Sequence, residues 1–230
     1  MAYHKKVLLL VFLWLALSGT TGFDKAAADD QYDAKINEAS LVLSEIIRIP
    51  EKGIPPALFR RAYGVAVIPQ LIKGGFILGG KHGKGILSVK SDNGEWTNPT
   101  FITLTGGGIG LQIGVQSTDI ILIFMRKKSY EYFLKGKFTL GADASVAAGP
   151  VGRYTGAATD VRLRAEIYSY SRSRGLFAGV SIDGSGLEID YRANGVYYKQ
   201  PVTVAEIFSG KVKGHRSAEM FRELLKDYSK

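Results

Sequence analysis

Alternating apolar and polar positions predict several strands, and the most regular alternation lies near the middle of the chain. Within residues 103–116, isoleucine, leucine and valine alternate with glycine and glutamine. A period of two is typical of a strand with one apolar face, and the glycines leave its other face nearly bare. Residues 119–125 are almost continuously apolar and predict a strand buried on both faces. We expect these two strands to form a hairpin that turns at residues 116–118.

Further strands are predicted on both sides of this centre. Asp92-Asn93-Gly94 is a strong hairpin-turn signal, and a second hairpin is expected around Ser173 and Arg174. Residues 187–198 fit a strand or a helix equally well. The other runs with strand character are residues 63–69, 76–79, 86–90, 138–148, 165–172 and 175–182.

Helical periodicity marks both ends of the predicted sheet. In residues 29–49 apolar side chains recur at helical spacing, and Pro50 ends the segment. We expect its apolar face to pack on the sheet; the alternative is a helix lying on a membrane, although few basic residues flank the apolar stripe. Shorter helices are predicted at residues 54–62, 129–134 with Ser129 as its N-cap, 202–208 with a capping box from Thr203 to Glu206, and 217–228.

These elements predict an α+β fold. Its sheet is expected to be mainly antiparallel and strongly curved or barrel-like, with helices packed at the N-terminal and C-terminal ends. The domain from 29 to 230 then divides into N-terminal helices (29–62), a β-rich core (63–186) and a C-terminal helical region (187–230).

The first 28 residues have the pattern of an export signal. His4, Lys5 and Lys6 precede an apolar segment at residues 7–17, which is short for a membrane-spanning helix. Residues 26–28 are alanines and offer a cleavage site before Asp29, with residues 20–22 as a competing site and an uncleaved anchor as the alternative. We therefore expect residues 1–28 to be a signal peptide and the protein to be exported to the periplasm or cell envelope.

The residues that commonly carry catalysis are scarce. The chain has no cysteine, which excludes disulfides, thiol chemistry and an acylated-cysteine anchor. Outside the predicted leader the histidines are His82 and His215, and no zinc-protease or serine-hydrolase motif occurs. The glycine cluster near residue 107 is followed by strand-like sequence, whereas a dinucleotide fingerprint needs a following helix. We expect a protein that is not an enzyme, with no cofactor and no metal.

An ordered series of motifs resembles the SYLF domain family. Its motifs begin with Ala-Tyr-Gly-Val-Ala-Val-Ile-Pro at residues 62–69 and end with Asn194, Tyr197 and Tyr198. The resemblance covers the chain from about the first helix to Tyr198, whereas the segment after Gln200 lies outside it. The resemblance implies lipid binding: eukaryotic members bind phosphoinositides, some fungal members bind actin, and bacterial members are typically exported. The remaining matching segments are residues 79–87, 96–101, 107–114, 119–121, 138–145, 149–153 and 167–181.

The net charge of +9 favours anionic partners, and an exported protein would meet lipid headgroups rather than nucleic acid. Lys81, His82 and Lys84 lie in a glycine-rich segment that we interpret as a turn, where ammonium groups and backbone N–H groups can approach a phosphate. Arg172 and Arg174, at the predicted hairpin tip, complete the candidate lipid-binding or anion-binding site. A solvated turn without a ligand is the alternative for the lysines.

The basic run at residues 126–128 is interpreted as the exit of a buried strand to solvent. The sequence thus predicts a non-enzymatic protein that binds lipid or a membrane surface through anionic phospholipid headgroups. The alternative is a structural or protein-interaction module of the envelope, with an envelope protein as its partner.

Overall fold

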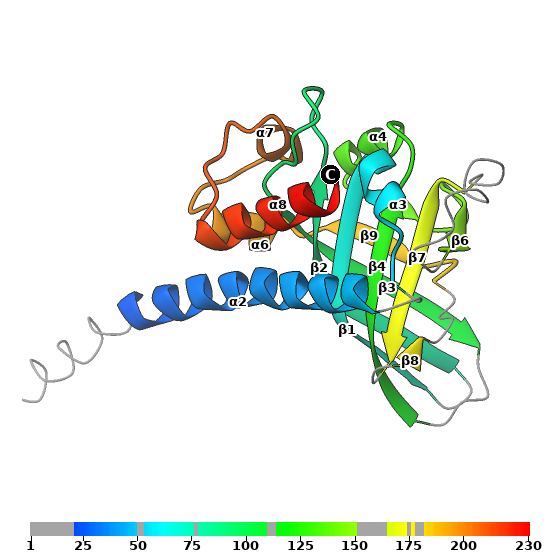
Figure 1. The fold of residues 1–230 in the computed structure, drawn as a ribbon. Coiled ribbons are helices and arrows are strands. Elements are labelled where there is room, and N and C mark those ends of the chain that lie inside the picture. The colour runs from blue at the N-terminus through cyan, green and yellow to red at the C-terminus, as the bar shows by residue number, and fades with distance from the viewer. Residues whose placement is uncertain are drawn as a thin grey trace, which may run out of the picture.

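The computed structural model describes residues 21–49, 53–75, 78–109, 114–150, 165–173, 176–177 and 182–230 (Figure 1). In this part of the chain a nine-stranded sheet curls into a half-barrel, and helices pack at both chain ends, which confirms the predicted α+β class. The helices are α2 (Thr21–Arg48), α3 (Pro56–Arg61), α4 (Ser129–Leu134), α6 (Tyr191–Tyr197), α7 (Val204–Phe208) and α8 (Arg216–Tyr228). The strands are β1 (Gly64–Gly75), β2 (Leu78–Val89), β3 (Thr100–Ile109), β4 (Gly114–Phe124), β5 (Lys137–Thr139), β6 (Val146–Ala148), β7 (Ile167–Ser173), β8 (Leu176–Phe177) and β9 (Gly186–Ile189).

The strand order corrects the predicted central hairpin. Strands follow one another as β5-β9-β3-β2-β1-β4-β7-β6, with β8 beside β7, and all neighbours are antiparallel except β6 and β7. Residues 116–118, expected as a turn, lie inside β4. Ile109 pairs with Leu78 and Gly114 with Gly75, so the β1–β2 hairpin separates β3 from β4. The prediction was wrong because a short apolar alternation does not specify which strand lies beside it.

A bulge in β1 bends the centre of the sheet. The pairing register of β1 shifts between Ile68 and Leu71, and Gln70 has a positive φ of 52°. The Gln70 N–H donates to Asp119 Oδ1 on β4 at 3.0 Å instead of to a ladder carbonyl. A bulge adds a residue to one strand and increases the local twist, which helps to curl the sheet.

Helix α2 lies along one face of the sheet, beside α6 and α8 (Figure 1). Its predicted apolar stripe is confirmed, because Ile36, Leu43 and Ile46 are fully buried. The Tyr32 ring packs edge-on against Phe101 of β3 at 5.0 Å between centroids. The helix begins at Thr21, upstream of the predicted start at Asp29. Packing on the fold, rather than a surface-lying helix, is therefore what the structure shows for α2.

The joint between α2 and α8 is polar. Asp33 Oδ2 lies 3.1 Å from His215 Nδ1, and Ser217 Oγ donates to Asp33 Oδ1. Ser217 Oγ also lies 3.0 Å from the Tyr197 hydroxyl on α6. Since His215 is the N-cap of α8 and makes no side-chain cap bond of its own, the Asp33 carboxylate supplies an acceptor at the start of that helix.

The structure shows the conformation of residues 187–198, which the sequence left open, and whether the predicted helix caps form. Residues 187–198 are a strand followed by a helix, because Asp190 between β9 and α6 accepts from the Ala193 N–H at 2.9 Å. The capping box of Thr203 and Glu206 is confirmed. The predicted Ser129 cap is wrong: Lys128 is the N-cap of α4, and the buried Ser129 hydroxyl has no partner among the described residues.

Candidate functional site

The structure corrects the placement of Lys81, His82 and Lys84. They lie within strand β2, between its neighbours β1 and β3, and not in a turn. Successive side chains of a strand point to opposite faces, so Lys81 and Lys84 face opposite sides of the sheet. Lys84 forms an ion pair with Asp190 at 3.6 Å, and His82 is exposed. The structure therefore does not bring the two ammonium groups together, and a lipid-binding role for these residues stays a prediction.

The Lys81 side chain lies over its neighbouring strand β3. A Cβ at Gly106, its cross-strand partner, would collide with Lys81 Cε and lie 2.8 Å from the Ser185 hydroxyl. Burial, and next the charge of Lys73, lowers the pKa of Lys81, whereas Asp183 raises it. The glycine at position 106 therefore gives the Lys81 stem room to cross β3.

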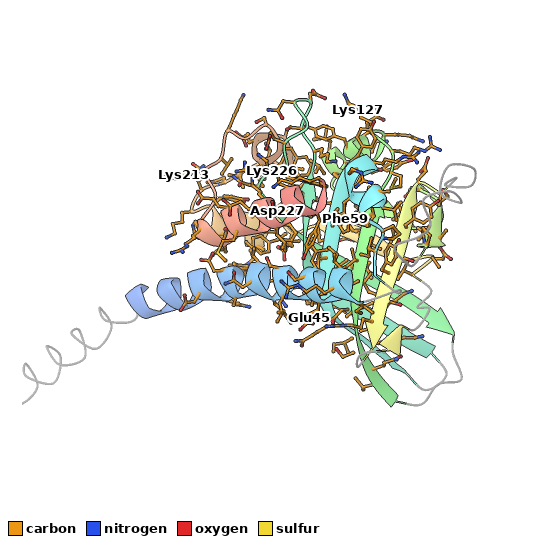
Figure 2. The ribbon with its side chains drawn as sticks, in the orientation of Figure 1. Glu45, Phe59, Lys127, Lys213, Lys226 and Asp227 are labelled. Carbon is orange, nitrogen blue, oxygen red and sulfur yellow. The ribbon has the colours of Figure 1, made fainter. Side chains whose placement is uncertain are left out.

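Arg172 is held by two carboxylates, and its role in binding an anion stays a prediction. Its guanidinium lies 2.6 Å from Glu45 on α2 and 3.0 Å from Asp119 on β4, and its side chain is only 19% exposed. Figure 2 shows Glu45 on the side of α2 that faces the lower part of the sheet. Burial alone would lower the pKa of Arg172, but the hydrogen bonds to Glu45 and Asp119 outweigh this and raise it. Arg174 lies outside the described residues; the hairpin expected there is confirmed by the pairing of Ser173 with Leu176.

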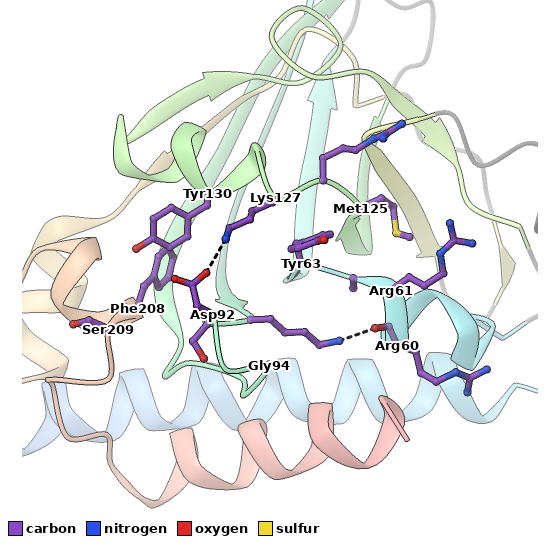
Figure 3. A pocket seen from close by; sticks show the side chains of 14 residues that line it. Arg60, Arg61, Tyr63, Asp92, Gly94, Met125, Lys127, Tyr130, Phe208 and Ser209 are labelled. Carbon is purple, nitrogen blue, oxygen red and sulfur yellow. Dashed lines mark hydrogen bonds and ion pairs between the residues drawn. The ribbon is translucent and has the colours of Figure 1, made fainter.

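A pocket of about 960 Å³ lies at the end of the sheet where β1 begins and β4 ends (Figure 3). Its walls come from four segments: the end of α3, the turn after β2, the connection from β4 to α4, and α7. The basic residues that line it are Arg60, Arg61, Lys90, Arg126 and Lys127. This pocket therefore brings five basic side chains of the described part of the chain together.

Two of the five basic side chains, Lys90 and Lys127, already contact oxygen atoms of the protein. Lys90 Nζ donates to the backbone oxygens of Phe59 and Arg60 at 3.0 and 2.9 Å, and so satisfies carbonyls at the end of α3. Burial lowers the pKa of Lys90, which also lies 5.0 Å from the Trp96 ring centroid. Lys127 Nζ lies 2.8 Å from Asp92 Oδ1, and Figure 2 shows Lys127 at the outer end of the molecule.

The other three basic side chains, Arg60, Arg61 and Arg126, are exposed and accessible to a ligand. Arg60 and Arg61 end α3, where positive charge is favourable near the helix C-terminus, and Arg126 follows β4. No carboxylate of the described residues forms an ion pair with any of these three arginines. Guanidinium groups bind phosphate and carboxylate oxygens through two parallel N–H donors.

Aromatic side chains give the pocket an apolar wall. Tyr63 is 44% exposed, and the Tyr130 and Phe208 rings lie 5.5 Å apart. Figure 3 places Tyr130 and Phe208 on one side, beside the Lys127–Asp92 pair, and Arg60 and Arg61 on the other, with Tyr63 between them. The pocket can thus hold an anionic group and an adjoining apolar part at once.

The sequence identified several of the segments that line this pocket but did not predict that they lie together. Residues 126–128 were interpreted as a strand exit and Asp92 as part of a turn, and both local interpretations are correct. Arg60 and Arg61 were included only in a short predicted helix. Two adjacent arginines at a helix end and a second basic run are the signal that could have pointed to this site.

The described residues contain no group of three or more histidine, cysteine, aspartate or glutamate side chains that could hold a metal ion. Among the helices of the same residues, none combines the length and the apolar character needed to cross a membrane.

The fold and the pocket define a curled-sheet α+β domain with a basic surface site. A family model described as "Ysc84: Las17-binding protein actin regulator" matches residues 105–228, and the chain belongs to this family. The resemblance to the SYLF domain is thereby confirmed. The match also corrects the C-terminal limit of the resemblance, which was expected to end at Tyr198, because α7 and α8 lie within the matched residues.

Named relatives come from vertebrates and yeast. SH3 domain-containing YSC84-like protein 1 of Xenopus laevis is 34% identical over 199 residues, which cover 84% of this chain and 59% of that protein. The Mus musculus protein of the same name is 33% identical over 202 residues, with 85% and 59% covered. Protein YSC84 of Saccharomyces cerevisiae is 36% identical over 178 residues, with 76% and 38% covered. The chain thus spans 38% to 59% of the length of these relatives.

Proposed function

We propose that this chain is a non-enzymatic binding module that holds phosphate groups of an anionic membrane surface, such as phospholipid headgroups, in the basic pocket. The observation that carries the proposal is the set of three exposed arginines, Arg60, Arg61 and Arg126, around one pocket. Their charge attracts an anionic surface, and their N–H donors match phosphate oxygens. The aromatic wall supports a ligand that has an apolar part next to its phosphate.

We propose that this binding takes place in the bacterial envelope. The predicted leader would direct the chain there, and anionic phospholipids are the phosphate-rich surface of that compartment. Lys84 and His82 on β2 supply further exposed basic or titratable groups, but they lie outside the residues that line the pocket.

Vesicle binding tests the proposal. The double variant Arg60→Ala/Arg61→Ala should bind phosphatidylglycerol-containing vesicles more weakly by about 2 kcal/mol, because each basic residue near an anionic surface contributes roughly 1 kcal/mol. Vesicles of phosphatidylcholine alone should bind the wild type weakly. The measurement is co-sedimentation at low and moderate salt, with thermal melting to show that both proteins are folded.

The control is Arg192→Ala/Arg216→Ala, which removes the same charge from exposed positions on α6 and α8, outside the pocket. Equal losses in the control and the pocket variant would show that net charge, and not this pocket, determines binding. A third variant, Lys81→Ala/Lys84→Ala, tests the residues of β2. A loss confined to that third variant would move the site to the sheet.

The alternative is a protein-interaction module. The family description names a Las17-binding protein and actin regulator, so protein partners are plausible for this chain as well. A basic pocket with aromatic walls can also receive an acidic protein segment. If the wild type binds no anionic vesicle at low salt, this second function is favoured, and co-sedimentation with actin filaments is the next measurement.

A further inference from the structure

The pocket contains one negative charge among its cations. Of the described residues that line it, Asp92 is the sole carboxylate, beside five basic side chains. Its Oδ1 lies 2.8 Å from Lys127 Nζ, in the ion pair drawn in Figure 3. The carboxylate therefore occupies a position beside Lys127 that an oxygen of a bound anion would otherwise take.

The turn that carries Asp92 does not need this carboxylate for its own structure. The Ser91 N–H donates to the Glu95 carbonyl at 2.9 Å, and the Gly94 N–H donates to the Ser91 carbonyl at 2.9 Å. The Asn93 side chain supplies the local acceptor, because its Oδ1 receives the Glu95 N–H at 3.0 Å. Gly94 has a φ of 83°, which suits glycine. Asp92 is thus free to face the pocket.

The Lys127–Asp92 pair is easy to open. The two side chains are 74% and 90% exposed, and ion pairs of this kind contribute little net stability. An exposed aspartate carboxylate is charged at neutral pH, and the hydrogen bond to Lys127 lowers the pKa of Asp92 further. A phosphate group offers several oxygens and as much charge or more, and three exposed arginines line the same pocket.

We propose that Asp92 is a built-in competitor for the anion site: its carboxylate holds Lys127 until a phosphate group displaces it. Lys127 then joins Arg60, Arg61 and Arg126 as a ligand-binding cation. This inference rests on the proposed function, because it assumes that the pocket binds phosphate. It adds a specificity element, since an anion must outcompete a carboxylate to gain the fourth cation.

The test is the variant Asp92→Asn, which keeps the size of the side chain and removes its charge. It should bind inorganic phosphate and phosphatidylglycerol vesicles roughly two- to fivefold more tightly than the wild type, as expected for loss of an exposed ion pair that competes with the ligand. Titration calorimetry with phosphate and co-sedimentation with vesicles distinguish a free phosphate from a lipid headgroup as the source of the group.

Two further variants separate competition from a change in net charge. Glu95→Gln removes one negative charge from the same turn, but Glu95 pairs with Lys226 on α8 at 3.6 Å and does not line the pocket, so its binding should stay at the wild-type level. Asp92→Asn/Lys127→Ala should lose the gain, because the freed ammonium group is absent. A gain that persists in this double variant would overturn the competition through Lys127.

The outcomes also separate this inference from the proposed function. If the wild type binds and Arg60→Ala/Arg61→Ala weakens binding, while Asp92→Asn binds like the wild type, the competitor role is overturned and the pocket stands. If neither the wild type nor Asp92→Asn binds phosphate or vesicles, both proposals are overturned. If Asp92→Asn binds and the wild type does not, the competitor role is supported, because the carboxylate then blocks the site completely.

Discussion

At the scale of single residues, two glycines decide how closely the central strands approach. A Cβ at Gly83 would lie 2.8 Å from both Ile68 Cγ2 and Leu71 Cδ1. A Cβ at Gly85 would collide with the Val67 carbonyl oxygen and lie 2.8 Å from Ile68 Cα. Gly83 and Gly85 thus lie in β2 opposite the bulge of β1, where backbone and side-chain atoms of β1 cover the strand.

We predict that Gly85→Ala destabilises the domain by about 1–3 kcal/mol. The added methyl group meets backbone atoms, which cannot rotate away, and the bulge must shift to admit it. Gly107→Ala on the neighbouring strand β3 is the control, because nothing lies within 4 Å of its Cβ position. Urea unfolding of both variants measures the difference, and equal midpoints would show that the bulge yields at no cost.

At the scale of elements, the helices at the two chain ends stabilise each other. Helix α2 packs its apolar stripe on the fold, and Asp33 joins it to Ser217 and His215 at the start of α8. Helix α8 is anchored in turn to the segment between β2 and β3, since Arg222 Nε donates to the Trp96 carbonyl at 2.9 Å. Helix α8 therefore links the N-terminal helix to the connection between β2 and β3.

The Asp33 joint gives a second stability prediction. Asp33→Ala should lower the free energy of unfolding by about 1–2 kcal/mol, because Ser217 and His215 lose their shared acceptor at a partly buried site. Asp30→Ala on the exposed side of the same helix should change it by less than about 0.5 kcal/mol. Chemical denaturation monitored by circular dichroism provides the measurement, and equal effects in the two variants would argue against the joint.

At the scale of the whole molecule, the pocket and the glycine-rich strand ends lie at opposite ends of the sheet. Strand β1 starts at Gly64 next to the pocket residue Tyr63 and ends at Gly75, where it pairs with β2 and β4. The three exposed arginines of the pocket therefore lie near the opposite end of the β1–β2 hairpin from Lys73 and Lys81. A membrane that docks on the pocket would meet α3 and the turn at residue 92 first.

The predicted export concerns the whole chain, and it gives a further prediction. Protein isolated from the native envelope should begin near Asp29 in intact-mass analysis. Cleavage there would remove residues 21–28 of α2 and leave the contacts that start at Tyr32 and Asp33. Recovery of a chain that begins at Met1 from the cytosol would contradict export.

Local patterns alone determined much of the fold. The stripe of Ile36, Leu43 and Ile46 identified α2, and Thr203 with Glu206 identified the start of α7. These features are readable because the interacting residues lie within a few positions of one another, so helical spacing or turn chemistry reveals them directly. The α+β class followed from the same kind of reasoning.

The tertiary structure determined which strands and which side chains are neighbours. The strand pairing shows that β1 and β2 lie between β3 and β4. Lys81 and Lys84 lie on opposite faces of the sheet because residues 78–89 form one strand. The pocket joins Arg60, Asp92 and Lys127, which are far apart in the sequence. No periodicity connects such distant positions, because their proximity results from packing and register over the whole sheet and not from local backbone preference.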